Sequence, residues 1–146
     1  MMAEIYQTLM DAKARGEKLL AVLLDPDKLS LAIVAAMQDT FDQNGVDLIL
    51  VGGSTVQKGS TQIIVHALKK ITTIPILIFP GEILLRLQRK LTASFFLTLL
   101  SGRNPEYLIE QQIKSVPFLM GSSLEVIPTG YILIDGGTET AVQRVK

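Results

Sequence analysis

This chain contains several short, largely apolar runs, and each run stops abruptly at a polar turn. Between the runs lie segments in which apolar residues recur at the spacing of a helix. The runs occupy residues 19–24, 46–51, 75–79 and 94–99. Apolar runs of this length are typical of strands that are buried on both faces. The segments between them are long enough for helices, and a repeated strand–helix unit builds a parallel sheet with right-handed crossovers. The chain therefore predicts an α/β fold.

The segments between the runs carry apolar residues at helical spacing. Ser30 is a candidate N-cap for a helix whose stripe is Val34, Met37 and Phe41 and which ends near Gly45. Other helices are expected over 5–16, from Ser60 or Thr61 to Ile71, over 82–90, over 107–116 and from Thr140 to Lys146. Each expected helix follows or precedes one expected strand, as a β-α repeat requires.

A fifth strand region is expected at 124–127 and 131–134, with a break at Pro128-Thr129-Gly130. About five β-α units then fill one domain over residues 1–146, which is a usual domain length. Two architectures fit this count: a complete five-stranded doubly wound sheet, or the first part of an eight-stranded (β/α)8 barrel. Periodicity alone does not decide between them.

Composition excludes several classes of function. Lys+Arg and Asp+Glu balance at 14 each, so no net field attracts nucleic acid, and none is expected as a partner. The absence of cysteine excludes disulfides and thiolate sites. The first residues lack the pattern of a signal peptide, and no apolar run approaches the roughly 20 residues of a membrane span. We expect a cytoplasmic protein. The single histidine, His66, lies in an expected helix and is interpreted as a surface residue.

The polar turns after the first two runs are the strongest candidates for a site. Asp25 and Asp27 follow the first run, and Gly52, Gly53 and Ser54 follow the second. Ligands of parallel α/β proteins bind at the carboxyl ends of the strands. Carboxylate and hydroxyl oxygens suit Mg²⁺, and glycine allows positive φ and close approach of a phosphate. The turns therefore indicate a phosphorylated substrate and a hard cation.

Each of these residues also has a purely structural interpretation. Asp25 can cap a helix or form an Asx turn, and Ser54 can cap a helix. Asp27 and Lys28 are interpreted as solvated turn residues, and Gly52 and Gly53 as an ordinary strand-to-loop turn.

Two further polar turns follow later strands. Arg103 and Asn104 follow the fourth expected strand and could reach a phosphate or the entrance for an apolar tail, although an ion pair that anchors the loop is an equal alternative for Arg103. Asp135, before two glycines, ends the fifth region and is assigned either to substrate contact or to holding the backbone.

Five motifs together resemble the geranylgeranylglyceryl phosphate synthase family, in its bacterial and euryarchaeal branch. They are LLDPDK at 23–28, LILVGGST at 48–55, ILIFPG at 76–81, LLSGRNPEYLI at 99–109 and LEVIPTGYILIDGG at 124–137. The resemblance implies a TIM-type (β/α)8 barrel, present here as a partial barrel of about five parallel β-α units. It also implies a Mg²⁺-dependent prenyltransferase that transfers a geranylgeranyl group from its diphosphate to sn-glycerol 1-phosphate in ether-lipid biosynthesis.

The resemblance implies roles for individual residues as well. Asp25 and Ser54 match the metal contacts of the family, with Thr55 as an alternative to Ser54. Substrate contacts are expected from residues at the strand exits: Gly52, Gly53, Arg103, Asn104 and Asp135. The general base and most of the glycerol phosphate site are expected beyond residue 146, so no catalytic residue is assigned. We also expect a homo-oligomer.

Two alternatives stay open. The chain could be a truncated, non-catalytic α/β protein that binds phosphate or Mg²⁺. It could also be a different phosphate-handling enzyme with a closed, doubly wound sheet.

Overall fold

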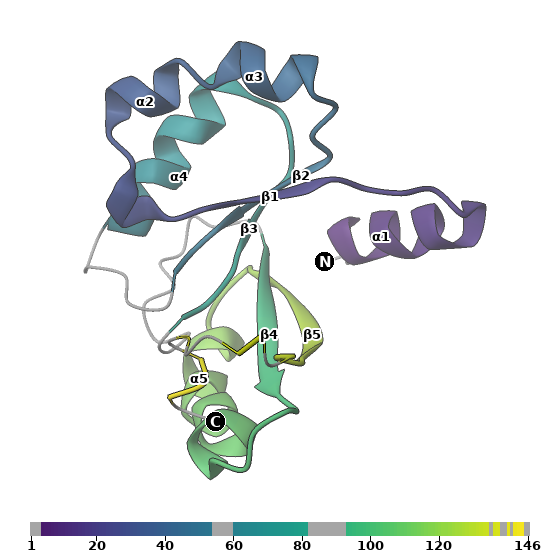
Figure 1. Cartoon of the computed structure of the whole chain (residues 1–146), viewed down its shortest axis with the longest axis vertical. Coiled ribbons are helices and arrows are strands. Elements are labelled where there is room, and N and C mark those ends of the chain that lie inside the picture. Colours follow the sequence, from purple (N-terminus) through teal and green to yellow (C-terminus); the bar gives the residue numbers. More distant parts are fainter. Residues whose placement is uncertain are drawn as a thin grey trace.

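The structure, a computed structural model, describes residues 4–53, 60–81, 93–134, 136, 137, 140 and 142–144. Helices and strands alternate along these residues (Figure 1). The elements are α1 (Glu4–Arg15), β1 (Ala21–Leu24), η1 (Pro26–Lys28), α2 (Leu31–Ala35), α3 (Gln38–Gln43), β2 (Leu48–Val51), α4 (Ser60–Ile71), β3 (Ile76–Ile78), β4 (Ala93–Leu99), η3 (Glu106–Glu110), α5 (Gln111–Met120) and β5 (Glu125–Tyr131). No helix among the described residues is long and apolar enough to span a membrane.

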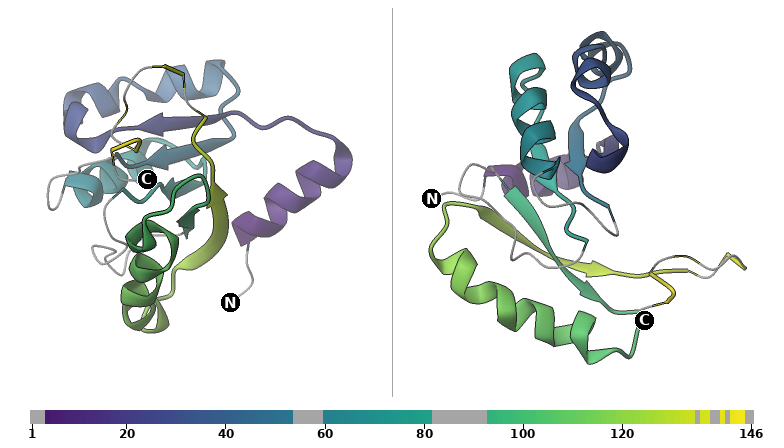
Figure 2. Two further views of the ribbon diagram at one scale, coloured as in Figure 1. Left: turned by 60° about the horizontal axis from the view of Figure 1, so that its bottom comes forward. Right: turned by 90° about the vertical axis from the view of Figure 1, so that its left-hand side faces the viewer.

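The strands form one parallel sheet in the order β1-β2-β3-β4-β5. A doubly wound sheet would reverse its strand order at a switch point, whereas a barrel wall keeps the order of the chain. The prediction of a partial barrel with five parallel units is therefore confirmed, and the doubly wound alternative is wrong. Figure 2 shows the group of α2, α3 and α4 at one end of the sheet and α5 at the other.

Alternate residues of β2 and β3 pack into two separate cores. Ile49 and Val51 of β2 face outward and pack with Val34 of α2 and Leu68 of α4. The inner face carries a second cluster that contains Leu48, Leu77, Ala93 and Ile127 together with Ile5 of α1. Burial on both faces explains why β2 and β3 are continuous apolar runs in the sequence.

Helix α1 is fixed at the amino ends of the strands by Glu125, the first residue of β5. The Glu125 carboxylate accepts hydrogen bonds from the backbone amides of Ile5 at 3.0 Å and Tyr6 at 2.7 Å. These amides lie in the first turn of α1, where helical amides lack internal acceptors and the helix dipole favours an anion. Figure 1 shows α1 apart from α2, α3 and α4.

The helix expected from Ser30 to Gly45 is two helices in the structure. Ser30 caps α2 as predicted, because its hydroxyl accepts a hydrogen bond from the Ile33 amide at 3.3 Å. The Ala36 amide is shared among three preceding carbonyls, which ends α2, and α3 starts at Gln38. Gly45 follows with φ 60°, a left-handed conformation that glycine adopts without strain.

The prediction that β5 breaks at Pro128 is wrong. Pro128 pairs with Phe96 and Gly130 with Thr98, so β5 continues to Tyr131 and ends before 132–134. Within the described sheet β5 pairs only with β4, and an edge strand tolerates proline because one side of its backbone needs no partner.

The helix expected over 107–116 begins one residue earlier as the π-helical turn η3. It continues as α5 through Pro117 to Met120. The helix expected over 82–90 lies outside the described residues. Of the helix expected from Thr140 to Lys146, the structure describes residues 140 and 142–144. Residues 142–144 form a turn, in which the Arg144 amide donates to the Thr140 carbonyl at 3.3 Å.

Candidate active site at the carboxyl ends of the strands

Asp25 lies directly after β1 and faces the carboxyl end of the sheet. One carboxylate oxygen accepts the Asp27 amide at 3.1 Å and caps η1, and the other lies 3.1 Å from Lys28 Nζ. The side chain of Asp25 is 31% exposed and that of Lys28 is 81% exposed. An ion pair with so exposed a lysine is weak and exchangeable. The Asx-turn interpretation of Asp25 is confirmed, and its carboxylate stays within reach of a ligand at the strand end.

Asp27 was expected from the sequence to be a solvated turn residue, but in the structure it makes a tertiary hydrogen bond. Its carboxylate accepts a hydrogen bond from the hydroxyl of Ser60, the first residue of α4, at 2.7 Å. The contact crosses 33 residues of sequence and ties the turn after β1 to the start of α4. A negative charge at this helix N-terminus is also favoured by the helix dipole. The turn that carries Asp25 is therefore held in place by a tertiary contact.

Gly52 is required by the packing of the backbone. Its amide donates to the Leu24 carbonyl at 3.0 Å, and a Cβ built on it would lie 1.8 Å from the Phe79 carbonyl oxygen. Its φ is not in the left-handed region, so the expectation of positive φ is wrong at this position. The exits of β2 and β3 thus approach each other too closely for any side chain here. Gly53 follows and is half-buried.

Two predicted site residues, Ser54 and Asp135, lie outside the described residues, as does the alternative ligand Thr55. Their assigned roles stay predictions.

The turn after β4 carries Arg103 and Asn104. The Asn104 side-chain oxygen accepts the Glu106 amide at 3.1 Å, and the Asn104 carbonyl accepts the Tyr107 amide at 3.1 Å, so Asn104 starts the helical segment. Arg103 is exposed, and among the described residues no carboxylate forms an ion pair with it. The ion pair that was the alternative for Arg103 is therefore not seen among the described residues, and the residue is exposed at the exit of β4.

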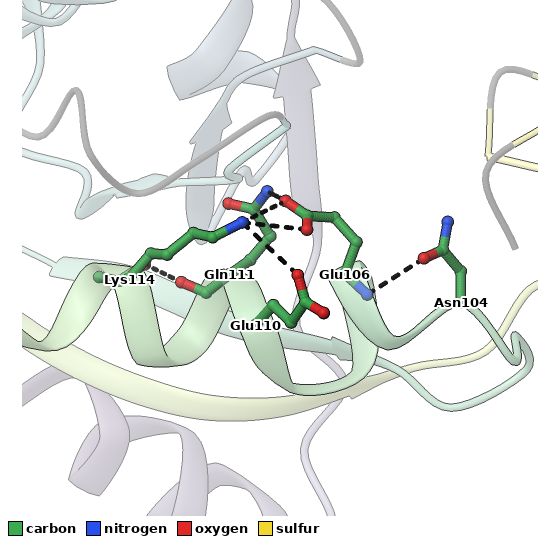
Figure 3. A network of polar contacts seen from close by, with 6 residues as sticks. Asn104, Glu106, Glu110, Gln111 and Lys114 are labelled. Atoms are coloured by element: carbon green, nitrogen blue, oxygen red, sulfur yellow. Dashed lines mark hydrogen bonds and ion pairs between the residues drawn. The ribbon is translucent and has the colours of Figure 1, made fainter.

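A polar network fixes the segment that follows Asn104 (Figure 3). Lys114 Nζ lies 2.9 and 3.0 Å from the two carboxylate oxygens of Glu106 and 3.6 Å from Glu110. The hydrogen bond from Lys114 lowers the pKa of Glu106, and the same bond raises the pKa of Lys114. Gln111 also donates to Glu106. The spacing of Glu106, Glu110 and Lys114 is the sequence signal for this network, because side chains four residues apart meet on a helix.

Gln112 connects the same segment to β4. Its side-chain amide donates to the Leu97 carbonyl at 2.6 Å, and it also reaches Thr98 Oγ1 and the Tyr107 carbonyl, each at 3.3 Å. The exits of β4 and β5 are joined in turn by the Ser101 hydroxyl, which accepts the Leu133 amide at 2.9 Å. Polar contacts thus align neighbouring strand exits on this side of the sheet.

Three aromatic rings gather on the inner face of the sheet. Phe79 follows β3 and meets Phe95 with ring centres 6.1 Å apart and Tyr131 with centres 5.9 Å apart, both edge to face. Phe95 packs against the inner core cluster. The sequence interpretation placed Phe79 and Tyr131 in strands without a site role. Register alone brings the three rings together, so no local sequence signal could have found the group.

The donor set at this edge suits a hard cation that keeps most of its water. Among residues 4–53, 60–81 and 93–134, no group of three or more His, Cys, Asp or Glu side chains could hold a metal. These residues therefore do not supply a complete set of protein ligands for a metal ion. Mg²⁺ sites on phosphate substrates need only one or two carboxylates, with waters and phosphate oxygens as the remaining ligands. Asp25 fits that requirement.

Comparison with known proteins identifies the family. A model of the PcrB family matches residues 12–145. The chain belongs to the PcrB family. Among its curated relatives, the geranylgeranylglyceryl phosphate synthase of Flavobacterium johnsoniae is 46% identical over 142 residues, covering 97% of this chain and 58% of the relative. That of Methanopyrus kandleri is 34% identical over 121 residues, covering 82% of this chain and 50% of the relative. The resemblance seen in the motifs is confirmed.

Two solved structures of geranylgeranylglyceryl phosphate synthases share the fold. The geranylgeranylglyceryl phosphate synthase of Thermoplasma acidophilum, in complex with sn-glycerol 1-phosphate, matches with a TM-score of 0.84 and 31% identity over 99% of this chain and 57% of its own. The enzyme of Thermoplasma volcanium matches with a TM-score of 0.78 and 30% identity over 88% of this chain and 51% of its own. The chain thus spans about half to three-fifths of the length of these relatives.

Proposed function

We propose that this chain forms the metal and diphosphate side of a geranylgeranylglyceryl phosphate synthase. The reaction transfers a geranylgeranyl group from its diphosphate to sn-glycerol 1-phosphate in ether-lipid biosynthesis. The observation that carries the proposal is Asp25, a partly exposed carboxylate at the carboxyl end of β1 in a PcrB-family barrel wall. Relatives that span nearly the whole chain bear this enzyme's name, which supports the same chemistry.

Each side of the proposed substrate has a matching group among the described residues. Asp25, with the predicted partner Ser54, would hold Mg²⁺. The ion supplies neutralising charge to a departing diphosphate. Arg103, an exposed cation at the exit of β4, suits phosphate oxygens. The rings of Phe79, Phe95 and Tyr131 offer an apolar wall suited to a prenyl chain.

Asp25→Asn tests this assignment. The change keeps the shape of the side chain and can still accept the Asp27 amide, but it removes the charge that a hard cation requires. We expect Mg²⁺-dependent binding of geranylgeranyl diphosphate to weaken about tenfold or more, which corresponds to a loss of about 1.4 kcal/mol. Isothermal titration of the diphosphate with and without Mg²⁺ measures the effect.

Asp39→Asn is the matched control, because Asp39 is an exposed carboxylate on α3. It should bind as the wild type does. Equal affinity of wild type and Asp25→Asn in the presence of Mg²⁺ would remove Asp25 from the site.

A cytoplasmic location and a homo-oligomeric assembly belong to the same proposal. Size-exclusion chromatography with light scattering measures the assembly directly.

A further inference from the structure

The carboxylate of Asp25 is held in one orientation by the residue two positions later. One of its oxygens, Oδ1, accepts a hydrogen bond from the Asp27 amide at 3.1 Å. The other oxygen, Oδ2, lies 3.1 Å from Nζ of Lys28, whose side chain is 81% exposed. Because an ion pair with so exposed a lysine exchanges readily, another cation can replace the ammonium group at Oδ2. The protein therefore fixes Oδ1 and leaves Oδ2 to a cation.

Asp27 links this carboxylate to the start of α4. Its own side-chain oxygen Oδ1 accepts a hydrogen bond from the hydroxyl of Ser60 at 2.7 Å. Asp27 is exposed and Ser60 is half-buried. The amide that orients Asp25 and the carboxylate that binds Ser60 belong to one residue, so a shift of the Asp27 side chain also shifts that amide. The hydrogen bonds thus form a series from Ser60 through Asp27 to Asp25.

The turn after β1 is also fixed on the side of β2. The carbonyl of Leu24, the residue before Asp25, accepts a hydrogen bond from the Gly52 amide at 3.0 Å. Gly52 and Ser60 lie on either side of Ser54 in the sequence, and Ser54 is the predicted second contact of the metal. The described residues that flank the Ser54 segment therefore bind the chain immediately before and after Asp25.

We propose that Asp27 and Ser60 are positioning residues for Asp25 in its role as a metal ligand. The inference rests on the proposed function, because it assigns Mg²⁺ to Oδ2 of Asp25. Hydrogen bonds orient the carboxylates that bind metals, and loss of such a partner commonly weakens metal binding about tenfold or more. The pair acts through Asp25, because it holds Oδ1 in place and keeps Oδ2 directed at the cation.

A purely structural alternative is that the Asp27–Ser60 hydrogen bond only stabilises α4. An anion at a helix N-terminus does stabilise the helix. This alternative predicts a loss of stability without a change in metal binding. Ser30→Ala is the matched control, because the Ser30 hydroxyl also lies at a helix start and accepts a hydrogen bond from the Ile33 amide at 3.3 Å. That contact involves neither Asp25 nor Asp27.

The first measurement needs neither metal nor diphosphate. In an amide proton–nitrogen correlation spectrum, the amide proton of Asp27 reports its hydrogen bond to Asp25. Ser60→Ala should shift this proton upfield, because the hydrogen bond becomes weaker when the Asp27 side chain is released. Ser60→Thr, which keeps the hydroxyl, should restore the original position, and Ser30→Ala should not move it. An unshifted proton in Ser60→Ala would overturn the proposal.

The second measurement is the Mg²⁺-dependent binding of geranylgeranyl diphosphate, in the same titration that is used for Asp25→Asn. Ser60→Ala and Asp27→Ala should each weaken binding about tenfold. The double variant should bind no more weakly than Asp27→Ala alone, because the two residues act through one hydrogen bond. Ser60→Thr should restore the affinity, and Ser30→Ala should bind as the wild type does.

The outcomes separate this proposal from the proposed function. Wild-type affinity in Ser60→Ala, together with a loss in Asp25→Asn, would overturn the positioning role and leave the proposed function intact. An equal loss of affinity in Ser30→Ala and Ser60→Ala would also overturn it, because the effect would then follow helix stability. Absence of Mg²⁺-dependent binding in the wild type would contradict the proposed function itself, and the positioning role with it.

Discussion

Gly52 illustrates how a residue at a strand exit can be fixed by packing and not by its ligand. A methyl group at this position would lie 1.8 Å from the Phe79 carbonyl oxygen and 2.8 Å from its carbon. Both atoms belong to the backbone of the neighbouring strand exit, so neither can move aside without shifting β3. A glycine at a strand exit therefore does not by itself indicate phosphate contact.

Gly52→Ala should destabilise the protein strongly because the backbone of β2 or β3 must move. We expect a loss of at least about 2 kcal/mol in the free energy of unfolding, at the upper end of overpacking effects. Urea denaturation followed by circular dichroism measures it. Gly121→Ala is the control, since its nearest atom would lie 3.9 Å away, and its change should stay within about 0.5 kcal/mol. Equal midpoints for both variants would contradict the packing argument.

At the scale of the element, α1 depends on a residue far away in the sequence. Glu125 lies 120 residues from Ile5, and its carboxylate satisfies two amides of the first turn of α1. Together with the burial of Ile5 on the inner core, this contact decides where α1 docks.

Glu125→Ala should loosen α1 without unfolding the sheet. Removing a side-chain cap from a helix N-terminus costs about 1–2 kcal/mol. Amide hydrogen exchange should become faster across α1, while the amides of β2 and β3 stay protected. Glu17→Gln, which removes a charge from an exposed local pair with Arg15, is the control and should leave exchange in α1 nearly unchanged. Unaltered protection of α1 in Glu125→Ala would show that apolar contacts alone hold the helix.

The start of α5 should make stability depend on pH. Lys114 lowers the pKa of Glu106, so the ionised pair contributes stability above the usual pKa of the carboxyl group and loses it as pH falls through the lowered pKa. Glu106→Gln removes this contribution. We expect it to lower the melting temperature at pH 7 and to have little effect at a pH below the lowered pKa. Thermal melts from pH 7 down to a pH below the lowered pKa, with Asp39→Asn as reference, check the direction of this effect. The same difference in melting temperature between wild type and Glu106→Gln at every pH would contradict it.

At the scale of the whole molecule, the described residues supply one side of the proposed reaction. Asp25, Arg103 and the aromatic group match a metal-bound diphosphate and its prenyl chain. Catalysis also requires that the acceptor hydroxyl be oriented toward the allylic carbon, and orientation accounts for much of an enzyme's rate. The loop for the acceptor phosphate and the general base are expected from units beyond β5.

Residues 1–146 alone should therefore have negligible transferase activity. The assay follows labelled glycerol phosphate into an extractable lipid in the presence of geranylgeranyl diphosphate and Mg²⁺, with the Flavobacterium johnsoniae enzyme as positive control. Turnover by residues 1–146 that is abolished by Asp25→Asn would place the acceptor site within this chain. Arg103, Asn104 and Asp135 would then be the first residues to substitute.

The sequence by itself determined the β-α repeat, the parallel strands and the family. The spacing of apolar residues and the contiguous motifs are local properties that can be read along the chain. It also placed Asp25 and Asn104 at strand exits. Only the tertiary structure decided what those exits contact, as the Asp27–Ser60 hydrogen bond and the approach of Gly52 to Phe79 show. It also decided that Glu125 accepts hydrogen bonds from α1 and that β5 continues through Pro128. These features depend on strand register and on residues far apart in the sequence, and neither is encoded in any local pattern.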